Sequence, residues 1–267
     1  MTPEQPRLAH NILLPKGLLV IAGLCMARSK SEIDQVAAMV KENGATVLRA
    51  GIDKPRTNST GEANALGNPI THPIPTGYEW LADAGRNHKI FTATEVMGPK
   101  HLEIAISVGI DVLWTGAASG LSPYLLQTVG ESGWPSLHKN AHGCTFAQFV
   151  GAIDHVRAGR KRNCWSTHQI FFLERGTTPE ASNPTRGIPR IDWVSALVNK
   201  GELVVGDISH TGGSPEFAIQ LARAYLAVGA IGIMVEVTLE EGTGAVDGSR
   251  QAVGPKRFEK LMKDIKS

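Results

Sequence analysis

Short apolar runs alternate with amphipathic segments along most of this chain. The run Gly17–Cys25 has the length and composition of a buried strand, and Lys30–Glu42 follows it with Ile33, Val36 and Val40 at helical spacing. The same alternation continues to the end of the chain. It predicts further strands at Thr46–Ile52, Ile90–Val96, Asp111–Thr115, Pro135–Lys139, Ser166–Glu174, Leu203–His210 and Gly232–Val237. It predicts further helices at Gly77–Ala84, Pro99–Val108, Pro123–Val129, Phe146–Ala158, Ile191–Asn199, Pro215–Val228 and Pro255–Ile265.

Eight strand–helix alternations without an intervening linker favour one α/β domain, a (β/α)₈ TIM barrel over residues 17–267. A doubly wound open sheet is the alternative, but such sheets more usually have five or six strands. Residues 1–16 precede the first predicted strand and are expected to form a short N-terminal extension.

Composition narrows the class of protein. With 267 residues, 42% apolar and 19% charged residues and a formal net charge of +2, the chain fits one soluble domain. No charged block predicts a nucleic-acid partner, and no apolar stretch is long enough to predict a membrane span. Three cysteines without regular spacing do not predict a disulfide framework, and the first residues lack a secretion-signal pattern. The expected location is therefore the cytoplasm.

Polar residues at the ends of the predicted strands carry the chemistry, because barrel enzymes place function at the carboxyl ends of their strands. Cys25 ends the first strand, His210 the seventh and Glu236 the eighth, and Asp247 follows in a glycine-rich loop. Barrel closure places the first strand beside the eighth. A thiolate, an imidazole and two carboxylates then predict a divalent-metal site for zinc, manganese, iron or cobalt. Taken alone, Cys25 is equally well explained as a buried core thiol.

A second set of residues at the same end is cationic. Its members are Arg49, Lys54, Arg56, Lys139 and Arg175. Arginine binds phosphate or carboxylate through a planar fork and lysine supplies a compact charge, so this set predicts an anion site. A metal beside such cations favours phosphorylated small-molecule substrates and carbonyl or phosphoryl chemistry.

Four short motifs resemble one enzyme family. They are Lys54-Pro55-Arg56-Thr57, Leu173-Glu174-Arg175-Gly176, the run from Asp207 to Gly213, and Met234-Val235-Glu236. In this order they resemble type I 3-deoxy-D-arabino-heptulosonate 7-phosphate (DAHP) synthase, a (β/α)₈ barrel, over roughly Lys16 to Lys263. The resemblance implies a metal-dependent condensation of phosphoenolpyruvate with erythrose 4-phosphate, the first step of the shikimate pathway to aromatic amino acids. It also implies a dimer or tetramer.

The resemblance implies a role for each matched residue. The metal ligands of the family are matched by Cys25, His210, Glu236 and Asp247. The resemblance also implies that Cys25, His210 and Lys139 are catalytic residues. Arg49, Lys139 and Arg175 match residues that bind phosphoenolpyruvate, and Lys54, Arg56 and Thr57 match the loop that receives erythrose 4-phosphate. Lys139 either donates a proton to the nascent alkoxide or orients the donor. The sister enzyme that makes 3-deoxy-D-manno-octulosonate 8-phosphate usually carries an asparagine-containing loop in place of Lys-Pro-Arg, which favours the four-carbon aldehyde.

The chain departs from the family pattern at two places. Gly116-Ala117-Ala118-Ser119 stands where the family has Gly-Ala-Arg with an arginine on the donor's phosphate, and Leu24 and Met26 flank Cys25 where the family has Gly-Pro-Cys-Ser. Three explanations stay open. Arg28 or His138 replaces the missing contact; the chain is a divergent paralogue with another donor or aldehyde; or it is a non-catalytic binding barrel.

Two further charged positions also have alternatives. Glu95 ends the third predicted strand, and it is either an active-site carboxylate or an orienting partner for a cation. Arg175 follows Glu174, so a structural ion pair between them is the alternative to substrate binding.

Overall fold

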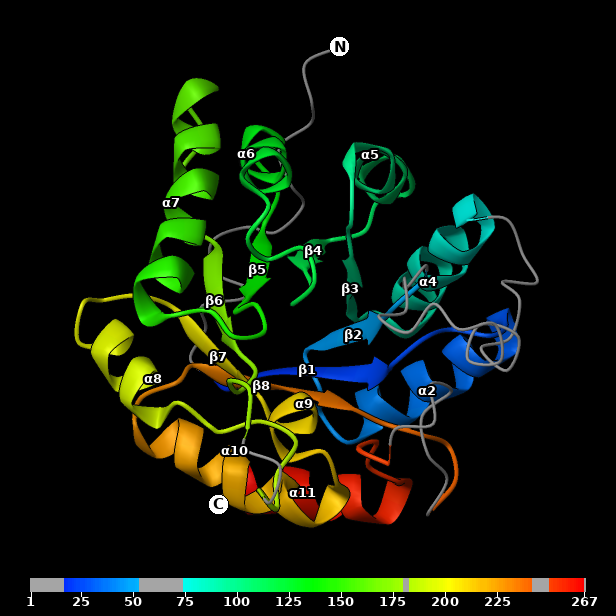
Figure 1. Cartoon of the computed structure of the whole chain (residues 1–267). Coiled ribbons are helices and arrows are strands. Elements are labelled where there is room, and N and C mark those ends of the chain that lie inside the picture. Colours follow the sequence, from blue (N-terminus) through cyan, green and yellow to red (C-terminus); the bar gives the residue numbers. More distant parts are fainter. Residues whose placement is uncertain (1–16, 53–73, 180–182, 242–249, 267) are drawn as a thin grey trace, which may run out of the picture.

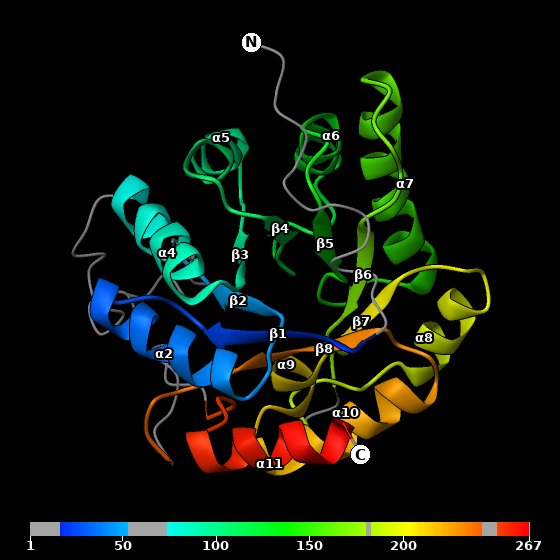
Figure 2. The ribbon, with the colours of Figure 1, turned by 180° about the vertical axis from the view of Figure 1, so that it is seen from behind.

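Eight parallel strands close into one barrel in the order β1 to β8, with the helices forming a layer around it (Figures 1 and 2). The computed structural model describes residues 17–52, 74–179, 183–241 and 250–266. β1 pairs in parallel with β2 on one side and with β8 on the other, which closes the ring. The predicted (β/α)₈ barrel is therefore confirmed and the open-sheet alternative is wrong. The predicted extension, residues 1–16, lies outside the described residues.

The elements follow the predicted alternation. The strands are β1 Leu19–Leu24, β2 Val47–Ala50, β3 Phe91–Glu95, β4 Val112–Thr115, β5 Ser136–Lys139, β6 Ile170–Glu174, β7 Val204–Asp207 and β8 Gly232–Glu236. The helices are α2 Lys30–Glu42, α4 Ile74–His88, α5 Pro99–Val108, α6 Pro123–Glu131, α7 Phe146–Arg162, α8 Ile191–Val198, α9 Ile208–Gly212, the 3₁₀ turn η1 Pro215–Phe217, α10 Ala218–Ala227 and α11 Pro255–Lys266.

Local sequence signals account for several of these boundaries. α2 has its predicted bounds, and the Ser29 side chain caps it by accepting a hydrogen bond from the Glu32 amide at 3.2 Å. α5 also has its predicted bounds, with proline in its first turn and Gly109 in a left-handed conformation after its last residue.

The predicted strand Leu203–His210 is wrong in its second half. β7 ends at Asp207, whose side chain accepts a hydrogen bond from the His210 amide at 3.0 Å and caps the short helix α9. His210 therefore lies on a helical turn after the strand, because an aspartate three residues upstream satisfies its amide and starts the turn there. The predicted helix Pro215–Val228 is likewise divided, into η1 and α10.

Side-chain alternation along the strands decides what reaches the barrel mouth. One face of the strands fills the barrel interior with residues such as Leu137, Val205 and Met234, while the opposite face packs against the helices. The next inward-facing position on each of these strands, two residues later, is charged. These positions are Lys139 on β5, Asp207 on β7 and Glu236 on β8. The barrel interior is thus apolar below and charged at its carboxyl end.

No helix in the described part of the chain combines the length and the apolar character needed to cross a bilayer.

We predict that Gly23→Ala destabilises the barrel by about 2–4 kcal/mol. Gly23 has φ of +156°, and a Cβ there would lie 2.0 Å from the backbone oxygen of Arg49 on β2. Gly17→Ala is the matched control, since a Cβ at Gly17 meets nothing within 4 Å. Urea denaturation measures the free energy of unfolding of both variants, and equal stabilities would contradict this account of Gly23.

Candidate active site at the carboxyl end of the barrel

Two buried ion pairs join opposite charges across the barrel mouth. The Lys139 ammonium lies 2.9 Å from the Asp207 carboxylate, and both side chains are at most 5% exposed. The Arg49 guanidinium lies 3.2 Å from the carboxylate of Glu236, and both are at most 1% exposed. These groups come from four different strands, so only barrel closure brings them together.

Arg49 is held inside the barrel with donors to spare. Its guanidinium stacks over the ring of the fully buried Trp114, 4.9 Å from the ring centroid. Its Nη2 donates to Glu236, while Nε and Nη1 are buried and have no hydrogen-bond partner among the described residues. Leaving buried donors unsatisfied is costly, so the arrangement suits an anion that accepts both hydrogen bonds.

Burial and pairing set the charge states of Lys139 and Asp207. Burial lowers the pKa of Lys139, and the adjacent Asp207 carboxylate opposes that shift. Burial opposes ionisation of Asp207 too, but His210 and Lys139 outweigh it, so the pKa of Asp207 lies well below its usual value. Asp207 is therefore a carboxylate, and Lys139 releases its proton more readily than a solvated lysine.

His210 is oriented by Asp207. Its Nδ1 lies 2.9 Å from the Asp207 carboxylate, and its Nε2 lies 3.4 Å from Oε1 of Glu236. Burial lowers the pKa of His210 to about 4, so its imidazole is neutral at neutral pH. A neutral imidazole with Nδ1–H bound to a carboxylate presents the lone pair of Nε2 toward Glu236, which is the arrangement of a metal-binding histidine.

The structure brings together only part of the predicted metal site. His210 and Glu236 converge, and Cys25 lies two residues after Gly23, which pairs with Glu236 across β1 and β8. Among the described residues, however, no three His, Cys, Asp or Glu side chains gather closely enough to hold a metal ion. Glu236 is instead held by Arg49 and by the Gln251 amide. Asp247 lies outside the described residues, so the metal site stays a prediction.

Of the residues predicted to bind substrate, some lie at the barrel mouth and others lie outside the described residues. Arg49, Lys139 and Arg175 all lie at the mouth, and Arg175 is 4% exposed. The loop residues Lys54, Arg56 and Thr57 lie outside the described residues.

The alternative of a Glu174–Arg175 ion pair is wrong. Nη1 of Arg175 hydrogen-bonds to Nδ1 of His142 at 2.9 Å. Glu174 faces the other side of the sheet, where its carboxylate accepts hydrogen bonds from the Tyr225 hydroxyl and, at 2.7 Å, from the Gly176 amide.

Both suggested replacements for the family arginine have partners within the protein. His138 alternates with the inward-facing Lys139, and its ring hydrogen-bonds to Thr115 at 3.0 Å and to Ser136 at 2.9 Å on the helix-facing side. Burial lowers the pKa of His138 to about 3, so it carries no charge at neutral pH. Arg28 forms an ion pair with Glu32 on α2.

Arg49, Lys139, Asp207 and Glu236 form a layer of buried charged side chains at the barrel mouth, called the charged layer below. Glu95 belongs to this layer. A Cβ on Gly116 would lie 1.8 Å from Oε1 of Glu95, so the glycine at the start of the Gly116–Ser119 motif makes room for this carboxylate. The charge of Glu95 also raises the pKa of Lys139, against the larger effect of burial. These contacts support its role as an orienting partner for a cation.

Several residues of the site escaped the sequence analysis. Asn140 ties β5 to β6, because its Oδ1 accepts from the Arg175 amide at 2.8 Å and its Nδ2 donates to the Gly176 carbonyl at 2.9 Å. The Tyr225 hydroxyl bridges Glu174 and Thr211, 3.0 Å from the threonine hydroxyl. The capping spacing of Asp207 ahead of His210 was visible in the sequence, whereas no local pattern connects Asn140 or Tyr225 with the strands that they join.

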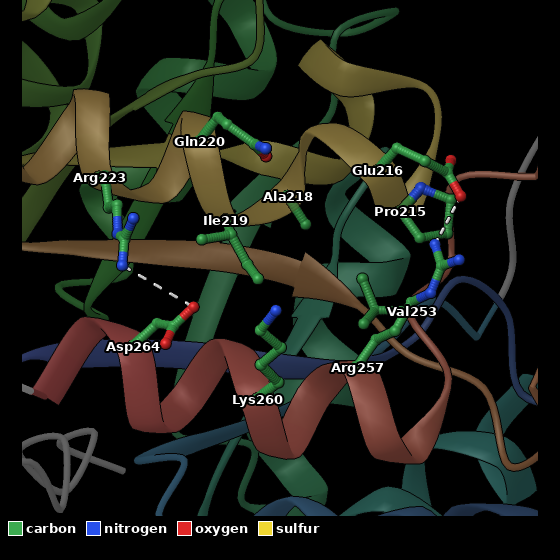
Figure 3. A pocket seen from close by; sticks show the side chains of 10 residues that line it. All are labelled: Pro215, Glu216, Ala218, Ile219, Gln220, Arg223, Val253, Arg257, Lys260 and Asp264. Atoms are coloured by element: carbon green, nitrogen blue, oxygen red, sulfur yellow. Dashed lines mark hydrogen bonds and ion pairs between the residues drawn. The ribbon is translucent and has the colours of Figure 1, made fainter.

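A surface groove of about 580 Å³ lies away from this layer, between α10 and α11 (Figure 3). Its floor includes Ile219. Two of its arginines face acids, Arg257 at 2.5 Å from Glu216 and Arg223 at 3.9 Å from Asp264. Both arginines of the groove are thus paired at the surface, whereas the ion pairs of the barrel mouth are buried, so the barrel mouth remains the candidate active site.

Comparison with known proteins agrees with the geometry. The model of the DAHP synthetase I family matches residues 15–267. Phospho-2-dehydro-3-deoxyheptonate aldolase of Thermotoga maritima is 30% identical over 92% of this chain and 68% of its own length. The crystal structure of that organism's DAHP synthase superposes with a TM-score of 0.78 at 27% identity, over 93% of this chain and 68% of the other. A 2-dehydro-3-deoxyphosphooctonate aldolase of Acidovorax ebreus is 24% identical over 96% of this chain and 91% of its own length.

The buried Glu174 makes the stability of the fold depend on pH. Burial raises its pKa from 4.5 to about 7. A raised folded-state pKa contributes stability that is fully present below the unfolded value and is lost as pH rises through the folded value. We therefore expect Glu174→Gln to gain stability relative to the wild type, by roughly 3 kcal/mol, between pH 4 and pH 8.

Urea denaturation across that pH range measures the effect, with Glu103→Gln on the exposed face of α5 as the matched control. A difference between Glu174→Gln and the wild type that does not change with pH would contradict the assignment.

Proposed function

Because this chain belongs to the DAHP synthetase I family, we propose that it condenses phosphoenolpyruvate with erythrose 4-phosphate to give DAHP and inorganic phosphate. The observation that carries the proposal is the buried layer of Arg49, Lys139 and Arg175 at the mouth of a family-type barrel. A phosphorylated carboxylic acid carries several negative charges, and arginine and lysine are the side chains that bind such groups.

In the proposed reaction, C3 of phosphoenolpyruvate forms a bond to the aldehyde carbon, water adds at C2, and inorganic phosphate leaves. Arg49 would bind the donor through the Nε and Nη1 atoms, which have no partner in the part of the chain that the structure describes. Lys139 would transfer a proton to the aldehyde oxygen, since its lowered pKa favours release and Asp207 holds its ammonium in place. The neighbouring Glu95 would keep the ammonium oriented between proton transfers.

The ligands proposed for a divalent ion are Cys25, His210, Glu236 and Asp247. The chemistry of this donor set fits such an ion, because His210 is neutral and is held by Asp207 with Nε2 toward Glu236. When bound there, the ion supplies Lewis-acid polarisation of the aldehyde carbonyl. Glu236 would then exchange part of its contact with Arg49, which frees the guanidinium for the substrate.

The similarity to octonate aldolases favours a five-carbon sugar phosphate as a second candidate acceptor. The octonate relatives match this chain over nearly their whole length at about a quarter identity. An eight-carbon product from a three-carbon donor requires a five-carbon aldose phosphate, so this aldehyde is the competing acceptor. The Lys54-Pro55-Arg56-Thr57 motif supports the four-carbon aldehyde as the better one.

An assay of phosphate release tests the proposal. With phosphoenolpyruvate, a divalent ion and erythrose 4-phosphate we expect turnover that stops with a chelator and returns when the ion is restored. The five-carbon aldose phosphate should give a lower kcat/KM. If neither acceptor gave turnover, the proposed enzymatic activity would be contradicted. A higher kcat/KM with the five-carbon sugar would contradict the proposed acceptor.

Lys139→Met should lower kcat about 10²–10⁴-fold if Lys139 transfers the proton. Methionine retains most of the buried volume, and Asp207 keeps its contact with His210. Lys100→Met on the exposed surface of α5 is the matched control. Steady-state kinetics and thermal unfolding should be measured together, and a folded Lys139→Met variant with near-normal kcat would leave Lys139 only an orienting role.

A further inference from the structure

The arginine that the family places after the fourth strand is absent here. Its position is taken by Ala118, an exposed residue in the turn that follows β4. Arg28 is paired with Glu32, and His138 faces the helices. A donor phosphate would therefore need a cation from another element.

The segment after β6 folds back on itself and brings a second arginine to the mouth. Thr177 and Ile188 exchange two backbone hydrogen bonds of 3.0 Å each. Gly176 and Gly187 pack so closely that a Cβ on Gly187 would lie 3.1 Å from Cα of Gly176. Arg175 and Arg186 immediately precede these two glycines, so the fold-back places the two arginines in neighbouring segments.

The backbone of Arg186 is anchored to the turn that carries His210. The Arg186 amide donates to the Gly212 carbonyl at 3.2 Å, and the Gly187 amide donates to the Thr211 carbonyl at 2.8 Å. Gly213 leaves the space that Arg186 occupies, because a Cβ at Gly213 would lie 2.5 Å from the Cβ of Arg186. The position of Arg186 is thus fixed by the same turn that carries His210.

The Arg186 side chain is directed toward the charged layer. Its Nη1 donates to Oε1 of Gln251, whose amide nitrogen donates to Glu236. The residue nevertheless stays exposed to solvent, which leaves its guanidinium accessible to a ligand. An ordinary surface arginine would not need a backbone anchor, a facing glycine and a link to a buried carboxylate.

Arg175 beside it has a positive charge without an ion-pair partner among the described residues. Its guanidinium is buried and hydrogen-bonds to His142. Burial, Arg175 and Arg186 all lower the pKa of His142, so this imidazole is a neutral acceptor. Burial lowers the pKa of Arg175 as well, and the charge of Arg186 contributes to that shift. Two arginines that repel each other at one rim form a site that an anion with two negative charges would stabilise.

We propose that Arg186 binds the phosphate group of the donor together with Arg175, and so supplies the contact that Ala118 lacks. This inference rests on the proposed function, since that function identifies the donor as a phosphorylated acid. The two guanidinium groups approach the phosphate from neighbouring segments of one fold-back, whereas the family arrangement takes its second arginine from the turn after β4.

Arg186→Ala should raise KM for phosphoenolpyruvate about ten- to a hundredfold, with a smaller effect on kcat and on KM for the aldehyde. Arg186→Lys should fall between this variant and the wild type, because lysine keeps the charge but loses the fork. Arg190→Ala is the matched control, since Arg190 lies shortly after Arg186, pairs with Asp192 at 2.5 Å and stacks on Trp193. A KM for Arg186→Ala equal to that of Arg190→Ala would overturn the inference.

Calorimetric binding of inorganic phosphate separates this inference from the proposed reaction. If the wild type turns over no substrate but binds phosphate, and Arg186→Ala weakens that binding about tenfold or more, the phosphate subsite stands and the proposed reaction fails. If the wild type binds phosphate and Arg186→Ala binds it equally well, the subsite is wrong whatever the outcome of the assay. A wild type that neither binds phosphate nor uses phosphoenolpyruvate overturns both.

Discussion

The pairing of buried charges at the carboxyl end of the barrel is the constraint on which the rest of the site depends. Removing an isolated charge from water is far more costly than a folded domain can tolerate, so charged groups inside a protein occur with partners. Asp207 meets this requirement for two neighbours at once, because its carboxylate lies 2.9 Å from the Lys139 ammonium and 2.9 Å from Nδ1 of His210. Glu236 does the same between Arg49 and His210. The two carboxylates thus position the three groups to which the proposed chemistry assigns proton transfer, anion binding and metal binding.

In the same layer, hydrogen-bond donors are fixed in place and available to an anionic ligand. Arg49 retains two buried donors without partners among the described residues, and the hydrogen-bond contacts of the Arg175 guanidinium in that part of the chain go to the neutral imidazole of His142. Arg49 is held in place by stacking on Trp114, and Arg175 by its backbone amide, which donates to the Asn140 side chain. A site whose donors are fixed before the ligand arrives needs little reorganisation when negative charge enters it, which is the physical basis of electrostatic preorganisation.

Membership of the family does not decide the acceptor. Relatives named for a seven-carbon product and relatives named for an eight-carbon product both match most of this chain. In the proposed reaction the donor would lie in the half of the mouth that is built from β2, β5 and β6, and Arg186 would add one cation there from the segment after β6.

The sequence by itself determined the elements, their order and most of the residues at the mouth. Alternating apolar runs and amphipathic segments act over short distances, and prolines and capping residues mark helix starts, so α2 and α5 were predicted to the residue. Strand order then placed Cys25, Lys139 and Glu236 at one end of the barrel. Only the tertiary structure decided which charges meet, that His210 lies on a helical turn, and that Arg186 shares a rim with Arg175. Pairings between side chains of distant strands depend on register, on inward or outward direction and on burial, and no local pattern of residues records them.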